Sequence, residues 1–179
     1  MAKKKRIDKN YKSYADSSEE LIIENETIDA GDWKPYADIL KFSNRQNVVV
    51  RNCVVYGANE DVVDINRFCK NIRFFNCRFI IRGARAMTIK ASGEVGLKDC
   101  VIVGRGKNHE IQLGNYTHTG NVKTYNIHLE NVTREDGKPV RVSVMNSQKP
   151  KVIGGNIKLQ VMFPLFWKIY FFLRDKGIL

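Results

Sequence analysis

The sequence contains few prolines, which interrupt regular secondary structure, and few cysteines, which can cross-link a chain. No long apolar run lies near its start. It has four prolines and four cysteines in 179 residues. The basic start Lys3-Lys4-Lys5-Arg6 is not followed by an apolar stretch, so we expect no secretory signal peptide. We therefore expect a chain that is cytoplasmic when made, with free thiols. No Cys-x-x-Cys pair is present, so the cysteines lack a zinc-site spacing.

Acidic residues are also scarce relative to basic ones. The chain has 19 Asp and Glu against 30 Lys and Arg, which gives a formal net charge of +11. Such an excess favours an acidic partner, for example an anionic polysaccharide, a nucleic acid or a lipid surface. The sequence has no nucleic-acid recognition motif, basic helix or aromatic platform between arginines, so we do not expect nucleic acid to be the partner.

A repeat is what the sequence does contain. Six short alternating segments end on Asn or Asp, at Asn25, Asn52, Asn76, Asp99, Asn131 and Asn156. The steps between these end points are 27, 24, 23, 32 and 25 residues. A near-constant period in this range indicates a solenoid, in which each repeat buries its apolar face by stacking on its neighbours. Asn tolerates left-handed backbone, and its amide can donate and accept along a stack, so each end point is predicted to be a bend.

Three of the cysteines directly follow a predicted bend: Cys53, Cys77 and Cys100. Equivalent positions on successive coils stack about 4.8 Å apart. The sequence therefore predicts an internal stack of small apolar side chains at these positions.

A second strand completes each repeat. Its members lie at 38–42, 62–66, 86–90, 110–114 and 141–145, and they share the period of the first set. Together the two sets predict an all-β fold, a single-stranded right-handed parallel β-helix of about six coils over residues 20–160. The longest step falls at 114–140, where we expect an insertion.

The two ends of the chain depart from the repeat. Residues 1–19 are predicted to form a basic N-terminal arm and cap. Residues 161–179 are strongly apolar, and Pro164 can open a helix there. The apolar run contains Lys168 and is shorter than the roughly 20 residues that a spanning helix needs. Three interpretations of this C-terminal helix stay open: a cap on the last coil, a homo-oligomer contact, or an interfacial membrane anchor.

Neighbours of the inward-facing residues should form polar ladders on the outside of the second-strand sheet. One ladder contains Lys41, Asp64, Thr88, Gln112 and Ser143, and the adjacent ones contain Asn66, Lys90, Glu110 and Arg141. This mixed face is the predicted substrate-binding surface, with Asp64, Glu110, Lys41, Asn66 and Gln112 as contacts and Tyr116 as an aromatic at its edge. Asp64 and Glu110, two coils and on the order of 10 Å apart, could serve as the carboxylate pair of a glycoside hydrolase.

Residues 59–66 are the part of the chain with the densest carboxylates. Glu60 and Asp64 lie four residues apart, and clustered carboxylates are the ligands that calcium prefers. A metal site and an ordinary acidic turn are both compatible with this pattern.

These repeats, with Glu60-Asp-Val-Val-Asp64-Ile65, resemble the pectate lyase-like right-handed parallel β-helix superfamily. The resemblance covers about residues 21–159. It implies calcium bound by Glu60 and Asp64 and a basic residue about one coil later, for which Arg85 and Lys90 are the candidates. Where the family has Arg-Pro-Arg with a proton-abstracting first arginine, this chain has Gly137-Lys138-Pro139-Val140-Arg141, so Arg141 or Lys138 would take that role.

The sequence thus predicts a carbohydrate-active or carbohydrate-binding protein that acts on an acidic polysaccharide or glycan. As an enzyme it would be a polysaccharide lyase or a glycoside hydrolase. The rival hypothesis is a non-catalytic structural or assembly module that oligomerises through 161–179. Short β-helices of this kind also look like bacteriophage components, so a virion association is a further expectation, made by analogy of fold alone.

Overall fold

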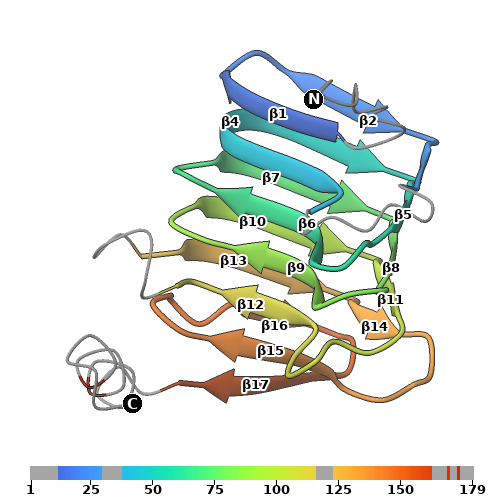
Figure 1. Ribbon diagram of the computed structural model, residues 1–179, viewed down its shortest axis with the longest axis vertical. Helices are drawn as coiled ribbons and strands as arrows, with labels where there is room; N and C mark the ends of the chain where they lie inside the picture. The colour runs from blue at the N-terminus through green and yellow to red at the C-terminus, as the bar shows by residue number, and fades with distance from the viewer. Residues whose placement is uncertain (1–11, 30–37, 116–122, 163–168, 170–172, 174–179) are drawn as a thin grey trace, which may run out of the picture.

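The computed structural model describes residues 12–29, 38–115, 123–162, 169 and 173, and their regular structure is dominated by β-strands that wind into a parallel solenoid (Figure 1). It has about five turns, against the six coils predicted. Every strand pairing is parallel. The all-β parallel β-helix predicted from the repeats is confirmed.

Three sheets run along the solenoid. Sheet A contains β1 (Lys12–Ser17), the first part of β4 (Leu40–Arg51), β6 (Asp61–Asn66), β9 (Arg85–Ile89), β12 (Ile111–Leu113), β15 (Val140–Val144) and β17 (Ile157–Val161). Sheet B contains β2 (Leu21–Glu24), the second part of β4, β7 (Lys70–Phe75), β10 (Gly93–Lys98), β13 (Tyr125–Glu130) and β16 (Lys151–Ile153). Sheet C contains β3 (Thr27–Asp29), β5 (Val54–Tyr56), β8 (Arg78–Ile80), β11 (Val101–Val103) and β14 (Thr133–Arg134).

The predicted bends lie between sheets B and C, and five of the six are confirmed. Asn25, Asn52, Asn76, Asp99 and Asn131 have φ angles of 56°, 55°, 49°, 54° and 50°. Their side chains also bond along the stack: the Nδ2 of Asn52 donates to Asn25 Oδ1 at 3.2 Å, and that of Asn76 donates to Asn52 Oδ1 at 2.9 Å. Further along, Asn131 Nδ2 donates to Asp99 Oδ1 at 2.9 Å.

The sixth predicted bend, Asn156, is wrong by two residues. Pairing of β13 with β16 aligns Glu130 with Ile153, so Gly154 is the residue opposite Asn131. Gly154 has a φ of 62°, and a Cβ on it would lie 2.3 Å from Asn131 Oδ1. Glycine takes this position because there is no room for a side chain. Asn156 instead donates from Nδ2 to the Gly137 carbonyl at 3.1 Å.

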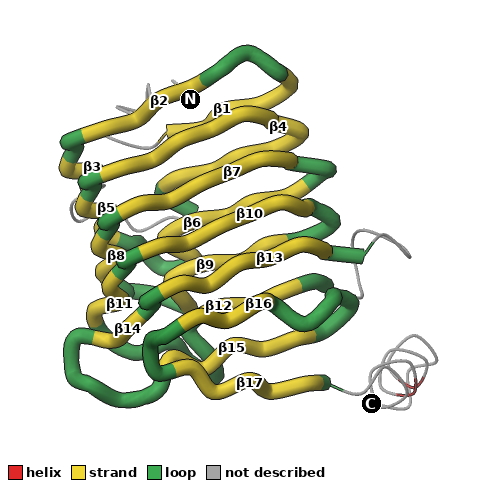
Figure 2. The backbone as a smooth tube through the Cα atoms, turned by 180° about the vertical axis from the view of Figure 1, so that it is seen from behind, coloured by secondary structure: helices red, strands yellow, loops and turns green. Residues whose placement is uncertain are grey.

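A second left-handed corner, which the sequence analysis did not predict, lies between sheets A and B. It uses the residue at or near the start of each sheet B segment, namely Asn47, Asn71, Glu94 and Asn126. Here too the amides stack, because Asn71 Nδ2 donates to Asn47 Oδ1 at 2.9 Å. Seen from behind, Figure 2 shows the sheet B strands stacked between these two rows of corners.

The core is the apolar interior of the solenoid. The predicted cysteine stack is confirmed: Cys53, Cys77 and Cys100 are buried free thiols, and Val132 continues the row on the next coil. Phe74 lies between Phe42 and Phe79 and packs edge-on against both rings, at centroid distances of 6.3 and 5.7 Å. Repetition of the same apolar position on each coil thus produces a continuous core.

The end of the predicted N-terminal arm and cap belongs to the first coil. Residues 12–17, assigned to the arm and cap, form strand β1, which pairs with β4 from Lys12 opposite Leu40 onward. The remainder of the arm, residues 1–11, lies outside the described residues.

The C-terminal end of the core is open as far as the described residues extend. Val152, Leu159 and Val161 are 39%, 36% and 44% exposed, although the register places them next to buried residues of the preceding coil. Val161, assigned to the C-terminal helix, instead ends strand β17. The rest of that predicted helix lies almost wholly outside the described residues. Within the described part of the chain, no helix is long and apolar enough to cross a bilayer.

Candidate functional site

The outer face of sheet A carries the predicted polar ladder. Strand register aligns Lys41 with Asp64, Asp64 with Thr88, Thr88 with Gln112, and Gln112 with Ser143. These side chains are not a solvated surface, since Asp64, Thr88 and Ser143 are at most 2% exposed. A polar ladder that is withdrawn from water must be satisfied by its own members, and most of its atoms are.

Three aspartates gather at the N-terminal half of this face, and we call Asp38, Asp61 and Asp64 the carboxylate cluster. Asp64 lies on β6 and has two cationic neighbours. Its Oδ1 lies 2.9 Å from Lys90 Nζ, and its Oδ2 lies 3.3 Å from Lys41 Nζ. Asn66 Nδ2 donates to the same Oδ2 at 2.5 Å.

Asp61 opens β6 and is held by the next coil. Arg85 Nε donates to its Oδ1 at 2.6 Å, and the Thr88 hydroxyl donates to its Oδ2. The Arg85 guanidinium also donates to Gln112 Oε1, which ties this aspartate to a third coil. Burial raises the pKa of Asp61, and Arg85 and Thr88 oppose that rise.

Asp38 precedes β4 and completes the cluster. Its Oδ1 accepts the backbone N–H of Asp61 at 3.3 Å, and its Oδ2 lies 3.5 Å from Lys41 Nζ. Burial, followed by the charges of Asp64 and Asp61, raises the pKa of Asp38 to about 6. Lys41 and Lys90 offset only part of this effect.

Lys41 also fixes how far apart two of the carboxylates can be. Asp38 Oδ2 and Asp64 Oδ2 lie 3.5 and 3.3 Å from the same Nζ, so they are separated by at most the sum, 6.8 Å. Burial lowers the pKa of Lys41, but Asp64 and Asp38 outweigh that effect and leave it raised. The ammonium group therefore stays charged between them.

Glu110, the other predicted carboxylate, belongs to a different group of contacts. It is fully buried, and Arg141 donates to it from Nη2 at 2.6 Å and from its backbone N–H at 2.7 Å. Burial alone would raise the pKa of Glu110, but the hydrogen bonds from Arg141 and the charge of Arg134 lower it overall. This carboxylate is held ionised as the ion-pair partner of Arg141. The predicted use of Asp64 and Glu110 as the carboxylate pair of a glycoside hydrolase stays a prediction.

The three predicted catalytic bases all contact carboxylates. Arg85 binds Asp61, Lys90 binds Asp64, and Arg141 binds Glu110. Hydrogen bonding to Glu110 raises the pKa of Arg141, which makes its guanidinium a poorer base. The structure brings Arg85 and Lys90 to the carboxylate cluster and Arg141 to a separate position. Their roles as bases stay predictions.

Calcium at Glu60 and Asp64 also stays a prediction. Asn66 Oδ1 is a buried oxygen without a hydrogen-bond donor among the described residues, which suits a hard cation. Against this, two lysine ammonium groups already lie on Asp64. Among the described residues no three His, Cys, Asp or Glu side chains form a metal-binding group. A calcium ion would have to displace Lys41 and Lys90, so the residues as placed do not fit one.

Gln112, another predicted substrate contact, lies beside Arg85 and His109. Gln112 accepts from Arg85, and His109 Nε2 lies 3.3 Å from the same Oε1. Burial, then the charge of Arg85, lowers the pKa of His109, so its imidazole is neutral near pH 7. Tyr116, the predicted aromatic edge, lies outside the described residues.

Sequence reasoning missed Asp38 and Asp61 as site residues. The available signal was their separation of 23 residues, which is one repeat, with Asp38 just before β4 and Asp61 at the start of β6. No family model matches the chain, and no curated protein matches it at a significant level. The site is therefore argued from its geometry.

Proposed function

We propose that this is a carbohydrate-active β-helix protein that cleaves a glycosidic bond of an acidic polysaccharide at the carboxylate cluster. One observation carries the proposal. Asp38 has a pKa raised to about 6, and its Oδ2 lies no more than 6.8 Å from the Oδ2 of a second carboxylate, Asp64. Most glycoside hydrolases use a carboxyl group with a raised pKa together with a second carboxylate nearby.

The different surroundings of Asp38 and Asp64 suggest a different catalytic role for each. Asp38, protonated below its pKa, would donate its proton to the glycosidic oxygen as the bond to the anomeric carbon breaks. Asp64, with two ammonium neighbours, would supply the second carboxylate. It would either take a proton from an attacking water or form the covalent glycosyl bond itself, and the upper bound on the separation is compatible with both.

The choice of an acidic polysaccharide is supported by charge and by resemblance. The chain carries a net charge of +11, which attracts a polyanion. The parallel β-helix and the carboxylates around Asp64 resemble the pectate lyase-like superfamily, whose substrates are acidic glycans. Cleavage by elimination, with Lys90 or Arg85 as base, is the alternative outcome for the same face, and its product differs chemically.

Paired variants test the proposal. Asp38→Asn keeps the shape of the side chain and removes its proton, so it should lower the release of reducing ends from acidic polysaccharides by at least about 100-fold. Asp64→Asn should do the same. Glu135→Gln is a matched control, because Glu135 is an exposed acid that pairs with Arg78 on sheet C.

The products and the metal dependence decide between the mechanisms. Hydrolysis gives a saturated new end, whereas elimination gives an unsaturated uronide that absorbs in the ultraviolet. We expect saturated ends, in equal amount with added calcium or with a chelator. Wild-type protein that releases no new ends from any acidic polysaccharide, including those it binds on a glycan array, would refute the proposal.

A second candidate function, assembly, is favoured by the open C-terminal end of the core. Val152, Leu159 and Val161 occupy inward positions and yet are exposed by 36–44%. A copy of the chain stacked there would bury them and would pair with the outer edges of β16 and β17, which no further strand of the described residues covers. The proposal expects an oligomer in light scattering and a monomer for the double variant Val152→Lys, Val161→Lys. A monomeric wild-type chain at micromolar concentration would exclude it.

A further inference from the structure

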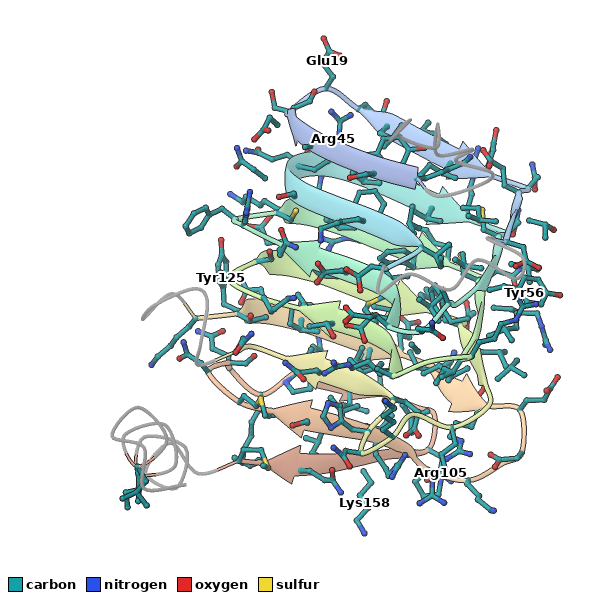
Figure 3. All side chains as sticks on the ribbon, in the orientation of Figure 1. Glu19, Arg45, Tyr56, Arg105, Tyr125 and Lys158 are labelled. Atoms are coloured by element: carbon teal, nitrogen blue, oxygen red, sulfur yellow. The ribbon has the colours of Figure 1, made fainter. Side chains whose placement is uncertain are left out.

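A pocket with a cationic lining lies at the C-terminal end of the solenoid, away from the carboxylate cluster. Its volume is about 270 Å³, and its lining residues are Arg105, Arg134, Lys138, Pro139, Arg141 and Lys158. They come from the segments after β11 and β14 and from β14, β15 and β17. Figure 3 shows Arg105 and Lys158 at the same end of the molecule, below β15.

Register brings two of these cations together. Arg141 on β15 is opposite Lys158 on β17, so the two lie on neighbouring strands. Arg134 approaches from sheet C, where it ends β14. The pocket thus lies where the sheet C segment of one coil turns toward sheet A of the next.

Positive charge in the pocket exceeds the negative charge that contacts it. Five of the six lining residues are cationic, and two acids, Glu110 and Asp136, contact them. Glu110 takes Arg141 and Arg134, and Asp136 takes Arg134 and, at 4.0 Å, Lys138. Among the described residues Arg105 and Lys158 have no acidic partner. The surplus favours an anionic ligand.

Arg134 supplies an independent observation. It is only 9% exposed, with Nη2 at 2.7 Å from Asp136 Oδ2 and Nη1 at 3.6 Å from Glu110 Oε1. Its Nε is buried and has no hydrogen-bond partner among the described residues. A buried N–H without an acceptor is costly, so Arg134 keeps hydrogen-bonding capacity that neither Asp136 nor Glu110 uses.

We propose that this pocket binds a tetrahedral oxyanion, a phosphate or sulfate group that is either free or carried as an ester. Several guanidinium and ammonium donors suit such a group, because its oxygens can accept paired hydrogen bonds from arginine and a further one from lysine at the same time. A single carboxylate has too few oxygens to use them. This inference does not rest on the proposed cleavage, since none of the lining residues belongs to the carboxylate cluster.

Calorimetric titration of the whole protein at low salt tests the site. The probes are inorganic phosphate, inorganic sulfate, glucose 6-phosphate and glucose 6-sulfate, with acetate and glucuronate as carboxylate comparisons. We expect saturable binding of the four tetrahedral oxyanion probes and at least tenfold weaker binding of the carboxylates. Tighter binding of the sugar esters than of the inorganic ions would assign an ester ligand, and equal binding a free ion.

Variants localise the binding to the pocket. Arg105→Ala and Lys158→Ala remove exposed side chains and should each weaken phosphate binding by on the order of tenfold. Arg134→Lys keeps the positive charge and removes the guanidinium, so it should also weaken phosphate binding. A cooperative thermal unfolding transition would show that this variant is folded. Lys151→Ala, an exposed lysine outside the pocket, is the matched control.

Two results would overturn the inference. One is phosphate binding that is not saturable or that Lys151→Ala weakens as much as Lys158→Ala does, which would indicate a general surface charge effect. The other is wild-type binding of acetate as tight as that of phosphate. Because Asp38→Asn leaves the pocket intact, it should not change phosphate affinity, and failure of one proposal leaves the other standing.

Discussion

Asn52 shows at the scale of a single residue why asparagine recurs at the corners. Its φ of 55° is costly for most side chains, and its amide both donates to Asn25 and accepts from Asn76. We expect Asn52→Ala to lower the free energy of unfolding by about 2 kcal/mol, through left-handed strain and lost hydrogen bonds. Asn52→Gly removes only the bonds and should cost about 1 kcal/mol. Urea unfolding measures both, and equal losses would show that backbone strain plays no part.

Asp38 makes stability depend on pH. Its native pKa of about 6 lies above the ordinary 3.8, so the folded state binds a proton more tightly than the unfolded state. The contribution of Asp38 to stability is therefore greatest below the unfolded pKa and falls as pH rises from about 4 to 6, by at most about 3 kcal/mol.

Chemical unfolding from pH 3.5 to 7.5, compared between wild type and Asp38→Asn, checks this linkage. The variant cannot titrate at this position, so its stability should fall less over the same range. A variant with the same pH dependence as wild type would assign the effect to other groups.

At the scale of elements, the cysteine stack is a row of equivalent positions, each between a bend residue and the strand of sheet C that follows it. Cys53, Cys77 and Cys100 are at most 1% exposed, and Cys69 is buried as well. Burial chiefly raises the pKa of Cys53 and Cys69, which keeps both thiols protonated. We expect a thiol reagent to label none of the four within minutes in the folded protein and all four after denaturation. Rapid labelling of the native state would show that the coils open locally.

The repeat could be predicted from the sequence where the backbone conformation of a corner selects one type of residue. Asn25 to Asn131 were found because the left-handed bend and the amide stack select Asn or Asp. Gly154 was missed because glycine meets the same φ without an amide, and a two-residue shift in the last repeat leaves the alternation unchanged. The corner at Asn47 was missed because it precedes the strand that the pattern marks.

The site was less predictable than the fold. Asp64, Lys41 and Lys90 were found because period-2 alternation sets the face of a strand. Asp38 and Asp61 lie at strand starts, where alternation gives no direction, and their contacts with Lys41 and Arg85 depend on the twist between coils. Glu110 was assigned to the same face, but its fork of hydrogen bonds with Arg141 is a property of side-chain packing that register alone does not give.

At the scale of the whole molecule, the two ends of the solenoid differ. In the first coil, which β1, β2 and β3 form, the inward residues Ile23 and Ile28 are buried, whereas the last coil exposes inward residues of β16 and β17. The carboxylate cluster lies nearer the first end and the cationic pocket nearer the second. A bound polyanion running along sheet A would meet both, with the acid chemistry at one place and the surplus charge at the other.

The pH dependence of cleavage by the wild-type protein tests the central claim, that Asp38 acts as a general acid, most directly. Release of reducing ends from an acidic polysaccharide should be high below pH 6 and fall about tenfold per unit above it, as Asp38 loses its proton. Asp38→Asn should be slow throughout. A wild-type rate that rises through pH 8 and yields unsaturated uronide would contradict the account and assign the face to elimination.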